Sequence, residues 1–374
     1  MTPASTIVSS NTQHRFTGAN VLVVGGAGFV GSNLVRQILQ ERPRKLTIID
    51  NFLSADPINV PNDPVINLVS GSITSERILR ELDNDLDYVY HLACFHGNQS
   101  SIHDPLVDHE NNTLTTLKLF DRLKDIKTIK KVVYAAAGCA VAAKTFDGAS
   151  ATTEDAPVSL FHDSPYSISK LIGEMYGNYY FTRYNLPFVK ARFQNVYGPR
   201  EMLGAGSWRG TPATVWRNVS PTFIWKSLHG EALPVENGGI ATRDFIFVED
   251  MARGLMACGL KGRAGEIYNL GSGVETTVLQ LAERINAATG NKTPIALTPA
   301  RDWDRSGQRF AAIDKAREEL GFTAQISHEE GIKRTVEWTR EYQGYILQCM
   351  MRHVHFVPDV ARYAQNEAIR YGTC

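Results

Sequence analysis

The 374-residue sequence predicts an α/β fold, in which a doubly wound parallel sheet is joined by a smaller, interleaved α/β lobe. Two observations carry this prediction. Short apolar runs alternate with amphipathic stretches along the chain, a pattern typical of parallel strands with helices on both faces of their sheet. Apolar residues make up 43% of the chain and charged residues 21%, so a sizeable core is expected and disorder is not.

The first elements surround a glycine-rich turn. Strands are expected over residues 21–24 and 46–50 with a helix over 32–39 between them, and residues 25–31 connect the first strand to the helix. The second strand ends in a carboxylate, Asp50. Strand, glycine turn, helix, strand and acid in this order are typical of a Rossmann-type dinucleotide-binding unit, although an ordinary strand–turn–helix is the alternative.

Each of these residues has a physical task when a dinucleotide is bound. Gly25 permits the tight turn, Gly28 lets the backbone approach the pyrophosphate, and Gly31 lets the helix lie close to the sheet. The helix N-terminus offers free N–H groups to the phosphates. Asp50 would accept hydrogen bonds from the adenosine ribose and repel a 2′-phosphate, which favours NAD over NADP.

The later elements suggest two lobes and two terminal extensions. Further strands are expected over residues 65–69, 86–91, 131–135 and 187–191, and helices over 112–123 and 167–183. Residues 200–220 favour a loop over a site, and shorter helices and strands follow at 223–229, 245–248, 267–270 and 278–289. We therefore expect a polar tail (1–17), an NAD-binding domain (18–199, with 236–264 returning to it), a substrate-binding lobe (200–235 and 265–344) and a C-terminal extension (345–374).

A second group of residues points to acid–base chemistry. Ser164 and Pro165 are expected to open a helix, on which Tyr166 and Lys170 are four residues apart and share one face. A nearby ammonium and the positive nicotinamide would lower the pKa of the phenol from about 10. The pair could then take a proton from a sugar hydroxyl as hydride leaves. The alternative is a surface tyrosine and lysine that share a helix by chance.

Further motifs show a resemblance to a known family over residues 19–340. They are Gly25-Gly26-Ala27-Gly28-Phe29-Val30-Gly31, His91-Leu92-Ala93-Cys94, Asp104-Pro105 followed by Asn112, the segment 192–199 (Arg-Phe-Gln-Asn-Val-Tyr-Gly-Pro) and Thr242-Arg243-Asp244-Phe245. Together with Tyr166 and Lys170 they resemble the extended short-chain dehydrogenase/reductases, specifically the NAD-dependent nucleotide-sugar epimerases and dehydratases.

This resemblance implies a set of binding residues. Besides the glycines, Asp50, Tyr166 and Lys170, NAD would contact Phe29, Val30, Asn51, Ser72, Ile73, Leu92, Ala93 and Asn112. The nucleotide sugar would contact Ser101, Asn195, Arg243, Arg305 and Arg309. A planar guanidinium such as that of Arg243 suits the diphosphate. For Arg305 and Arg309, a solvated basic turn is the alternative.

Two positions depart from the family pattern. Ala137 stands where the family has a Ser or Thr that bonds the sugar O4, and Thr152, Thr153 and Ser164 are the nearest substitutes. Cys139 follows Gly138 where related dehydratases carry an acidic pair. GDP-mannose 3,5-epimerases carry a Cys at this position for proton transfer, but Arg209 replaces their partner lysine. Cys139 is therefore either an acid/base or a small buried residue.

These observations predict a nucleotide-sugar epimerase that works through a transient 4-keto sugar. It would invert C4, or C3 and C5 if Cys139 transfers protons. The same fold could instead perform dehydration, decarboxylation or reduction. A different class of function is an NAD-binding or sensing protein whose catalysis has decayed, which Ala137 permits.

Composition limits the partners and the compartment. Basic and acidic residues balance at 39 each, and no run of about 18 apolar residues exists, so neither nucleic acid nor a membrane is an expected partner. The five cysteines (Cys94, Cys139, Cys258, Cys349 and Cys374) lack metal-ligand spacing, so free thiols, no metal and a cytoplasmic location are expected. The resemblance implies a homodimer that pairs through the helices near 112–123 and 167–183.

Overall fold

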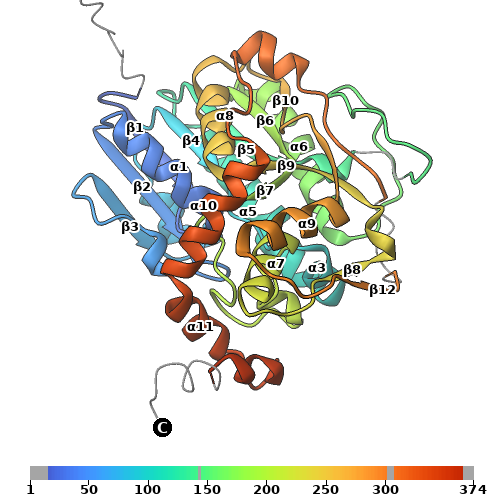
Figure 1. Ribbon diagram of the computed structural model, residues 1–374. Helices are drawn as coiled ribbons and strands as arrows, with labels where there is room; N and C mark the ends of the chain where they lie inside the picture. The colour runs from blue at the N-terminus through green and yellow to red at the C-terminus, as the bar shows by residue number, and fades with distance from the viewer. Residues whose placement is uncertain (1–15, 142–144, 301–306, 365–374) are drawn as a thin grey trace, which may run out of the picture.

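The computed structural model describes residues 16–141, 145–300 and 307–364. Most of the expected polar tail, together with Arg305 and Cys374, lies outside these ranges. Within them, a large parallel sheet lies beside a smaller lobe built from later parts of the chain (Figure 1). This arrangement confirms the predicted α/β fold class.

The main sheet has seven strands, all parallel, in the order β10-β6-β5-β4-β1-β2-β3. The change of direction on either side of β1 is the mark of a doubly wound sheet, and ligands bind beyond the carboxyl ends of strands at such a point. The strands are β1 (Asn20–Val24), β2 (Lys45–Asp50), β3 (Ile66–Ser70), β4 (Tyr88–His91), β5 (Lys131–Ala137), β6 (Phe188–Phe193) and β10 (Ile267–Leu270).

Helices bury both faces of this sheet. Alternate residues of β1 enter different cores, because successive side chains of a strand point to opposite faces. Val21 and Val23 pack with α1 (Phe29–Gln40) and α8 (Val248–Lys261), whereas Leu22 and Val24 share a core with α5 (Thr115–Leu123) and α6 (Pro165–Tyr184). All four valines and leucines are almost completely buried, as expected for a parallel sheet covered on both sides.

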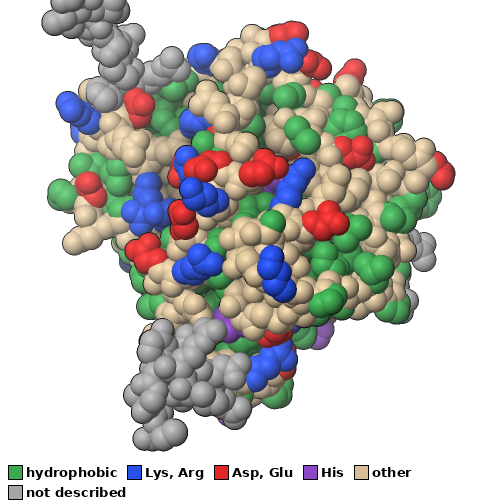
Figure 2. Space-filling view, in the orientation of Figure 1, with side chains coloured by type: hydrophobic (Ala, Val, Ile, Leu, Met, Phe, Trp, Pro, Cys, Tyr) green, Lys and Arg blue, Asp and Glu red, His purple; other side chains and the backbone are tan. Residues whose placement is uncertain are grey.

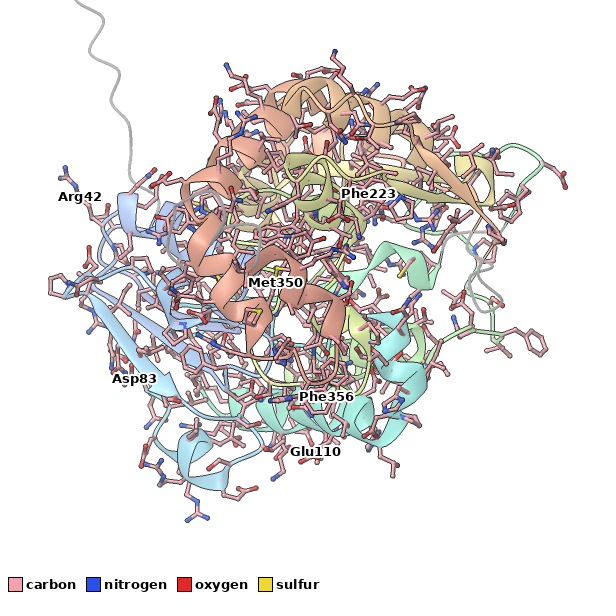
Figure 3. The ribbon with its side chains drawn as sticks, turned by 60° about the horizontal axis from the view of Figure 1, so that its bottom comes forward. Arg42, Asp83, Glu110, Phe223, Met350 and Phe356 are labelled. Carbon is pink, nitrogen blue, oxygen red and sulfur yellow. The ribbon has the colours of Figure 1, made fainter. Side chains whose placement is uncertain are left out.

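The smaller lobe has its own sheets and core. A three-stranded sheet has the order β11-β9-β7, and β8 pairs with β12. Its strands are β7 (Asn195–Tyr197), β8 (Pro234–Glu236), β9 (Thr242–Phe247), β11 (Glu275–Thr277) and β12 (Ala296–Thr298), and its helices are α7 (Val219–Leu228), α9 (Val278–Thr289) and α10 (His328–Glu341). Phe223 (Figure 3) is in the core between α7 and α9.

Several boundaries differ from the sequence prediction. Strands β7 and β9, expected in the NAD-binding domain (18–199 with 236–264), pair in the sheet of the smaller lobe. Strand β10 was assigned with 265–344 to the smaller lobe, but it pairs with β6 at the end of the main sheet, where Tyr268 and Leu270 are fully buried. The helix expected from residue 112 begins earlier. After α2 (Glu76–Arg80) and α3 (Asn98–His103), helical turns run through α4 (Pro105–Asp108) and a wider turn (His109–Leu114) into α5.

The C-terminal extension packs against the loop that follows β7. Helix α11 (Gln343–Met351) shares a core with residues of that loop, among them Met202 and Leu203 (Figure 3 labels Met350 on this helix). Its Tyr345 hydroxyl donates a hydrogen bond of 2.7 Å to the buried carboxylate of Asp56. The extension therefore has a packing role behind the two loops, 51–56 and 201–217.

Candidate active site

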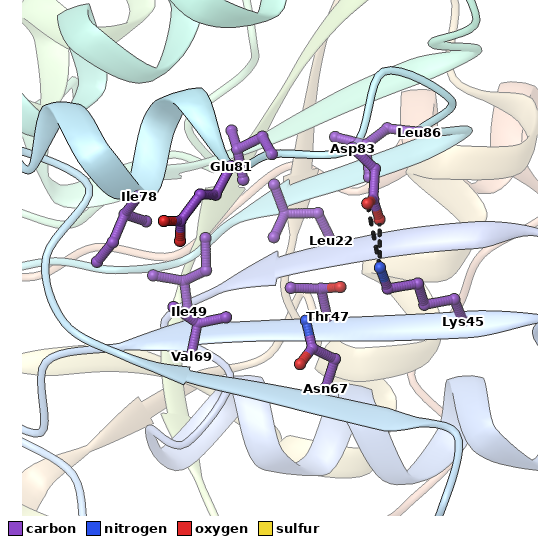
Figure 4. A pocket seen from close by; sticks show the side chains of 11 residues that line it. Leu22, Lys45, Thr47, Ile49, Asn67, Val69, Ile78, Glu81, Asp83 and Leu86 are labelled. Carbon is purple, nitrogen blue, oxygen red and sulfur yellow. Dashed lines mark hydrogen bonds and ion pairs between the residues drawn. The ribbon is translucent and has the colours of Figure 1, made fainter.

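A cavity of about 720 Å³ lies between the main sheet and the smaller lobe. Its size is within the range of small-molecule and cofactor sites, about 300–1,000 Å³. Its wall combines the glycine turn, the carboxyl ends of β2, β4 and β5, the first turns of α6, and segments of the lobe. A second hollow, at the outer strands of the sheet, is only about 40 Å³, and the Lys45–Asp83 ion pair forms part of its wall (Figure 4).

The glycine turn has the geometry that a pyrophosphate requires. Gly25 has a φ of +84°, and a Cβ there would lie 2.5 Å from the backbone nitrogen of Ala93. A Cβ on Gly31 would overlap the carbonyl oxygen of Gly25. Gly28 begins α1, and no side chain within the described residues caps this helix end. Backbone N–H groups are therefore available to an anion in the cavity, and the turn fits a dinucleotide.

Asp50 ends β2 in the cavity wall. Its Oδ2 accepts a hydrogen bond of 3.0 Å from the N–H of Ala27, and its Oδ1 accepts one of 2.9 Å from the N–H of Phe52. Burial raises the pKa of this carboxyl, and the backbone hydrogen bonds oppose that shift. Each carboxylate oxygen keeps a second lone pair, so the group can still accept a ribose hydroxyl.

The cavity gathers most of the predicted cofactor residues. Phe29, Val30, Asn51, Ser72, Ile73, Leu92 and Ala93 line it. Asn112 lies behind the wall instead, where its side chain accepts from the N–H of Phe95 at 2.7 Å and donates to the carbonyl of Phe95 at 3.2 Å. Asn112 therefore holds the backbone of the segment that follows β4 and does not line the cavity.

Tyr166 and Lys170 enter the same cavity from the first turns of α6. The Ser164 hydroxyl caps this helix by accepting from the N–H of Ser167, and Pro165 occupies its first turn. The Lys170 ammonium lies 5.8 Å from the centre of the Tyr166 ring and donates 2.9 Å to the carbonyl of Ala135.

The pKa of Tyr166 differs from the sequence expectation. Burial is the main cause that raises it well above its usual value, and the neighbouring Cys94 and Cys139 thiols act in the same direction. In the protein alone, the cost of burying a phenolate outweighs the attraction of the ammonium. The predicted lowering therefore depends on further positive charge at the site.

Ala137 and Cys139 lie at the end of β5, close to Tyr166. Both line the cavity, and both belong to the apolar cluster that contacts the Tyr166 ring. Thr152, Thr153 and Ser164, the candidates for replacing the missing hydroxyl, do not line the cavity. The Ser164 hydroxyl donates to Asn98 Oδ1 at 3.2 Å and is 3% exposed.

The lobe contributes the predicted substrate residues Asn195, Arg243 and Arg309 to the cavity. The Arg243 Nη1 donates a hydrogen bond of 2.7 Å to the carbonyl of Gly307, which also lines the cavity. Ser101 does not line the cavity, because its buried hydroxyl donates to the carbonyl of Asn98 at 2.9 Å.

Sequence reasoning missed several polar residues of the cavity wall, among them His96, Glu201 and Arg217. His96 follows the motif of residues 91–94 by two positions, a signal that could have identified it. Glu201 and Arg217 are in the loop of irregular sequence, where nothing in the spacing identifies them. Arg217 donates 2.6 Å to the carbonyl of Ser54 and so connects this loop to the one after β2.

Three further observations concern the described ranges of the chain. There, no three His, Cys, Asp or Glu side chains gather in a way that could hold a metal ion. No helix of those ranges is both long and apolar enough to span a bilayer. On the face in Figure 2, blue and red side chains are interspersed rather than gathered into one patch of a single sign.

Comparison with known proteins agrees with the geometry of the cavity. The model of the NAD dependent epimerase/dehydratase family matches residues 21–271. The UDP-glucose 4-epimerase of Mycolicibacterium smegmatis is 30% identical over 326 residues, which cover 85% of this chain and 98% of that protein.

Solved structures of similar proteins carry cofactor and nucleotide. The Bordetella bronchiseptica enzyme WbmF, crystallised with NAD+ and UDP, is 53% identical, with a TM-score of 0.83 over 92% of this chain and 99% of WbmF. The Thermotoga maritima UDP-glucose 4-epimerase, crystallised with UDP-glucose, is 28% identical, with a TM-score of 0.78 over 87% of this chain and 99% of that one.

Proposed function

This chain belongs to the NAD-dependent epimerase/dehydratase family, and on that premise we propose that it epimerises a nucleoside-diphosphate sugar through a transient 4-keto sugar. One observation carries the proposal: the Tyr166–Lys170 pair and the glycine turn line one cavity. A base and a dinucleotide cradle in one cavity are what reversible oxidation of a hydroxyl requires.

Uracil is the base that the proposal assigns to the substrate. WbmF was crystallised with UDP and the Thermotoga maritima enzyme with UDP-glucose, and this chain spans nearly the whole length of both. Asn195 and Arg243, on β7 and β9, would hold the diphosphate end of the substrate. A guanidinium binds phosphate oxygens through parallel hydrogen bonds, which suits Arg243 for this task.

The cavity residues divide the chemistry between them. When bound, NAD supplies the acceptor for a hydride from the sugar and later returns that hydride. Tyr166 takes the proton of the sugar hydroxyl and later gives it back. Lys170, fixed by its hydrogen bond to Ala135, stabilises the phenolate through its charge and can bond the nicotinamide ribose.

Epimerisation is favoured over dehydration by the residues at positions 138 and 139. The resemblance places an acidic pair of the dehydratases at residues 138 and 139. In this chain Gly138 and Cys139 stand there instead, and neither side chain carries a carboxyl group. The thiol of Cys139 can exchange a proton with the carbon beside the ketone, and this exchange would invert C3 or C5.

A binding protein without turnover is the competing function. Ala137, which offers no hydroxyl to the sugar, and the raised pKa of Tyr166 favour it. The test is incubation of the purified protein with UDP-, GDP-, dTDP- and CDP-sugars in deuterated water, with products identified by NMR. We expect a UDP-sugar to be inverted. Deuterium at C3 or C5 of the product would show that Cys139 transfers a proton. Inversion at C4 without label would show that the hydride simply returns to the other face of the sugar. No conversion of any nucleotide sugar would refute the proposal.

The proposal includes a homodimer that pairs through α6. Ile168, Met175 and Tyr179 are spaced by seven and four residues on this helix, so they share one face, and they are 45%, 59% and 50% exposed. Exposed apolar side chains in a stripe are typical of an interface. Met175→Glu should shift the protein from dimer to monomer in sedimentation, and a wild-type monomer would refute the pairing.

A further inference from the structure

His96 holds a distinctive place in the cavity. Its side chain is open to the cavity, and its ring meets the Tyr166 ring edge-on, with centroids 5.8 Å apart and an interplanar angle of 75°. Within the described part of the chain, no group forms a hydrogen bond with the imidazole. Both ring nitrogens are therefore available to a ligand beside Tyr166.

The backbone around His96 is held on both sides. Asn112 forms two hydrogen bonds with the backbone of Phe95, and Arg209 donates 2.8 Å from Nη1 to the carbonyl of His96. Arg209 is 6% exposed, and its Nη2 donates a hydrogen bond of 3.3 Å to the carbonyl of Ala213. Arg209 thus positions the wall of the cavity, which explains why it is no substitute for a proton-donating lysine.

The surroundings of His96 keep its imidazole neutral. Desolvation by the surrounding cavity wall lowers the pKa of His96 to about 3, and the cations Arg209, Arg217 and Lys170 act in the same direction. A neutral imidazole near a carbonyl or hydroxyl can donate an N–H hydrogen bond without giving up its proton. Such a donor acts like the hydroxyl of a Ser or Thr.

We propose that His96 donates the hydrogen bond to the sugar O4 that Ala137 cannot supply, an inference that rests on the proposed function. The O4 atom must lie within reach of the Tyr166 oxygen. Ala137 packs with Tyr166 in one apolar cluster, and His96 contacts the edge of the same ring. A donor lost at residue 137 can therefore be replaced from residue 96.

The oxidation of the sugar at C4 requires no proton from His96. The O–H bond at C4 breaks and its proton goes to the phenolate oxygen of Tyr166. The C4–H bond breaks, its hydride goes to NAD, and a C4=O double bond forms. The N–H of His96 bonds O4 before and after this change and becomes stronger as negative charge develops on the oxygen.

The test measures single-turnover hydride transfer, read from the nicotinamide absorbance after mixing with the UDP-sugar that the wild-type protein converts. His96→Phe keeps a ring against Tyr166 but removes the donor, and we expect a loss of about 100-fold with UDP binding unchanged. His96→Gln, which keeps an N–H, should retain most of the rate. His355→Phe, at an exposed position outside the cavity, is the matched control.

The decisive variant restores the hydroxyl. In the His96→Phe background, Ala137→Ser should recover the rate about tenfold or more, because the hydroxyl at residue 137 and the N–H of His96 serve the same oxygen. A His96→Phe protein as fast as wild type, or no recovery in the double variant, would overturn the assignment while leaving the epimerase intact. If the wild-type protein transfers no hydride from any nucleotide sugar, the proposed function fails and the assignment with it. Calorimetry with UDP shows whether each variant is folded.

Discussion

The ammonium of Lys170 lies 5.8 Å from the centre of the Tyr166 ring, one helical turn away on α6. The hydrogen bond from Lys170 to Ala135 ties this helix to the end of β5, beside the glycine turn's cavity. The pair is thus fixed by the sheet rather than by a loop. Fixed geometry at the reacting oxygen is the property that acid–base catalysis requires.

Tyr166→Phe removes the proposed base and leaves the ring packing in place. We expect the rate of epimerisation to fall by about 10²–10⁴-fold, while NAD and UDP still bind. Product formation in a coupled assay measures the change. Tyr184→Phe, in the last turn of the same helix, is the control. If Tyr166→Phe kept the full rate, a binding protein or another base would have to be considered.

Gly31→Ala tests the close packing of α1 on the sheet. The added methyl group would overlap the carbonyl oxygen of Gly25, so the helix must move away from the turn. We expect weaker NAD binding and a lower melting temperature, by several degrees for a loss of about 1–3 kcal/mol. Gly344→Ala, where a Cβ meets nothing within 4 Å, should leave both unchanged. Equal NAD affinity in the two variants would contradict the assigned role of the turn.

Asp50 should set the preference for NAD over NADP. Its carboxylate is held by the N–H groups of Ala27 and Phe52 and faces the cavity. Replacing it by Asn removes the charge that repels a 2′-phosphate. We expect NAD to bind more weakly and the NAD-to-NADP affinity ratio to fall by about tenfold or more. Titration with both cofactors measures the ratio, and an unchanged ratio would show that another residue reads the ribose.

Glu201 gives the fold a specific dependence on pH. Burial raises its pKa from 4.5 to about 7, although Asn218 and Arg217 oppose the shift. Between these values the folded state binds a proton that the unfolded state releases, so the free energy of unfolding falls as pH rises through this range. Glu201→Gln should remove that decline, worth up to about 3 kcal/mol.

Denaturant unfolding from about pH 4 to 8 measures this effect. The Glu201→Gln variant should gain stability relative to the wild-type protein as the pH rises. Glu337→Gln, at an exposed position of α10, is the control. Parallel stability curves for Glu201→Gln and the wild-type protein would show that the carboxyl keeps its ordinary affinity for protons when folded.

The sequence predicted the parts of the fold and of the cavity that depend on local chemistry. The glycine turn, Asp50 and the Tyr166–Lys170 spacing are short-range patterns, and each of these residues lines the cavity. Placing β10 in the main sheet required knowledge of its pairing with β6, about 75 residues earlier in the chain.

The rest of the site depends on contacts between distant segments. Residues 201–217 reach the cavity because the C-terminal extension packs behind them, and the Tyr345–Asp56 hydrogen bond joins residues 289 positions apart. Spacing along the chain carries no signal of such contacts. The same limit explains why Asn112 and Ser101 were expected to contact ligands, although their side chains form hydrogen bonds with backbone groups behind the cavity wall.

The most direct measurement uses a UDP-sugar deuterated at C4. If hydride leaves C4 and returns within one cavity, the epimer formed must carry its deuterium on C4, whichever carbon is inverted, and Tyr166→Phe must slow its formation. An epimer that has lost the C4 deuterium to solvent would contradict the transient 4-keto sugar.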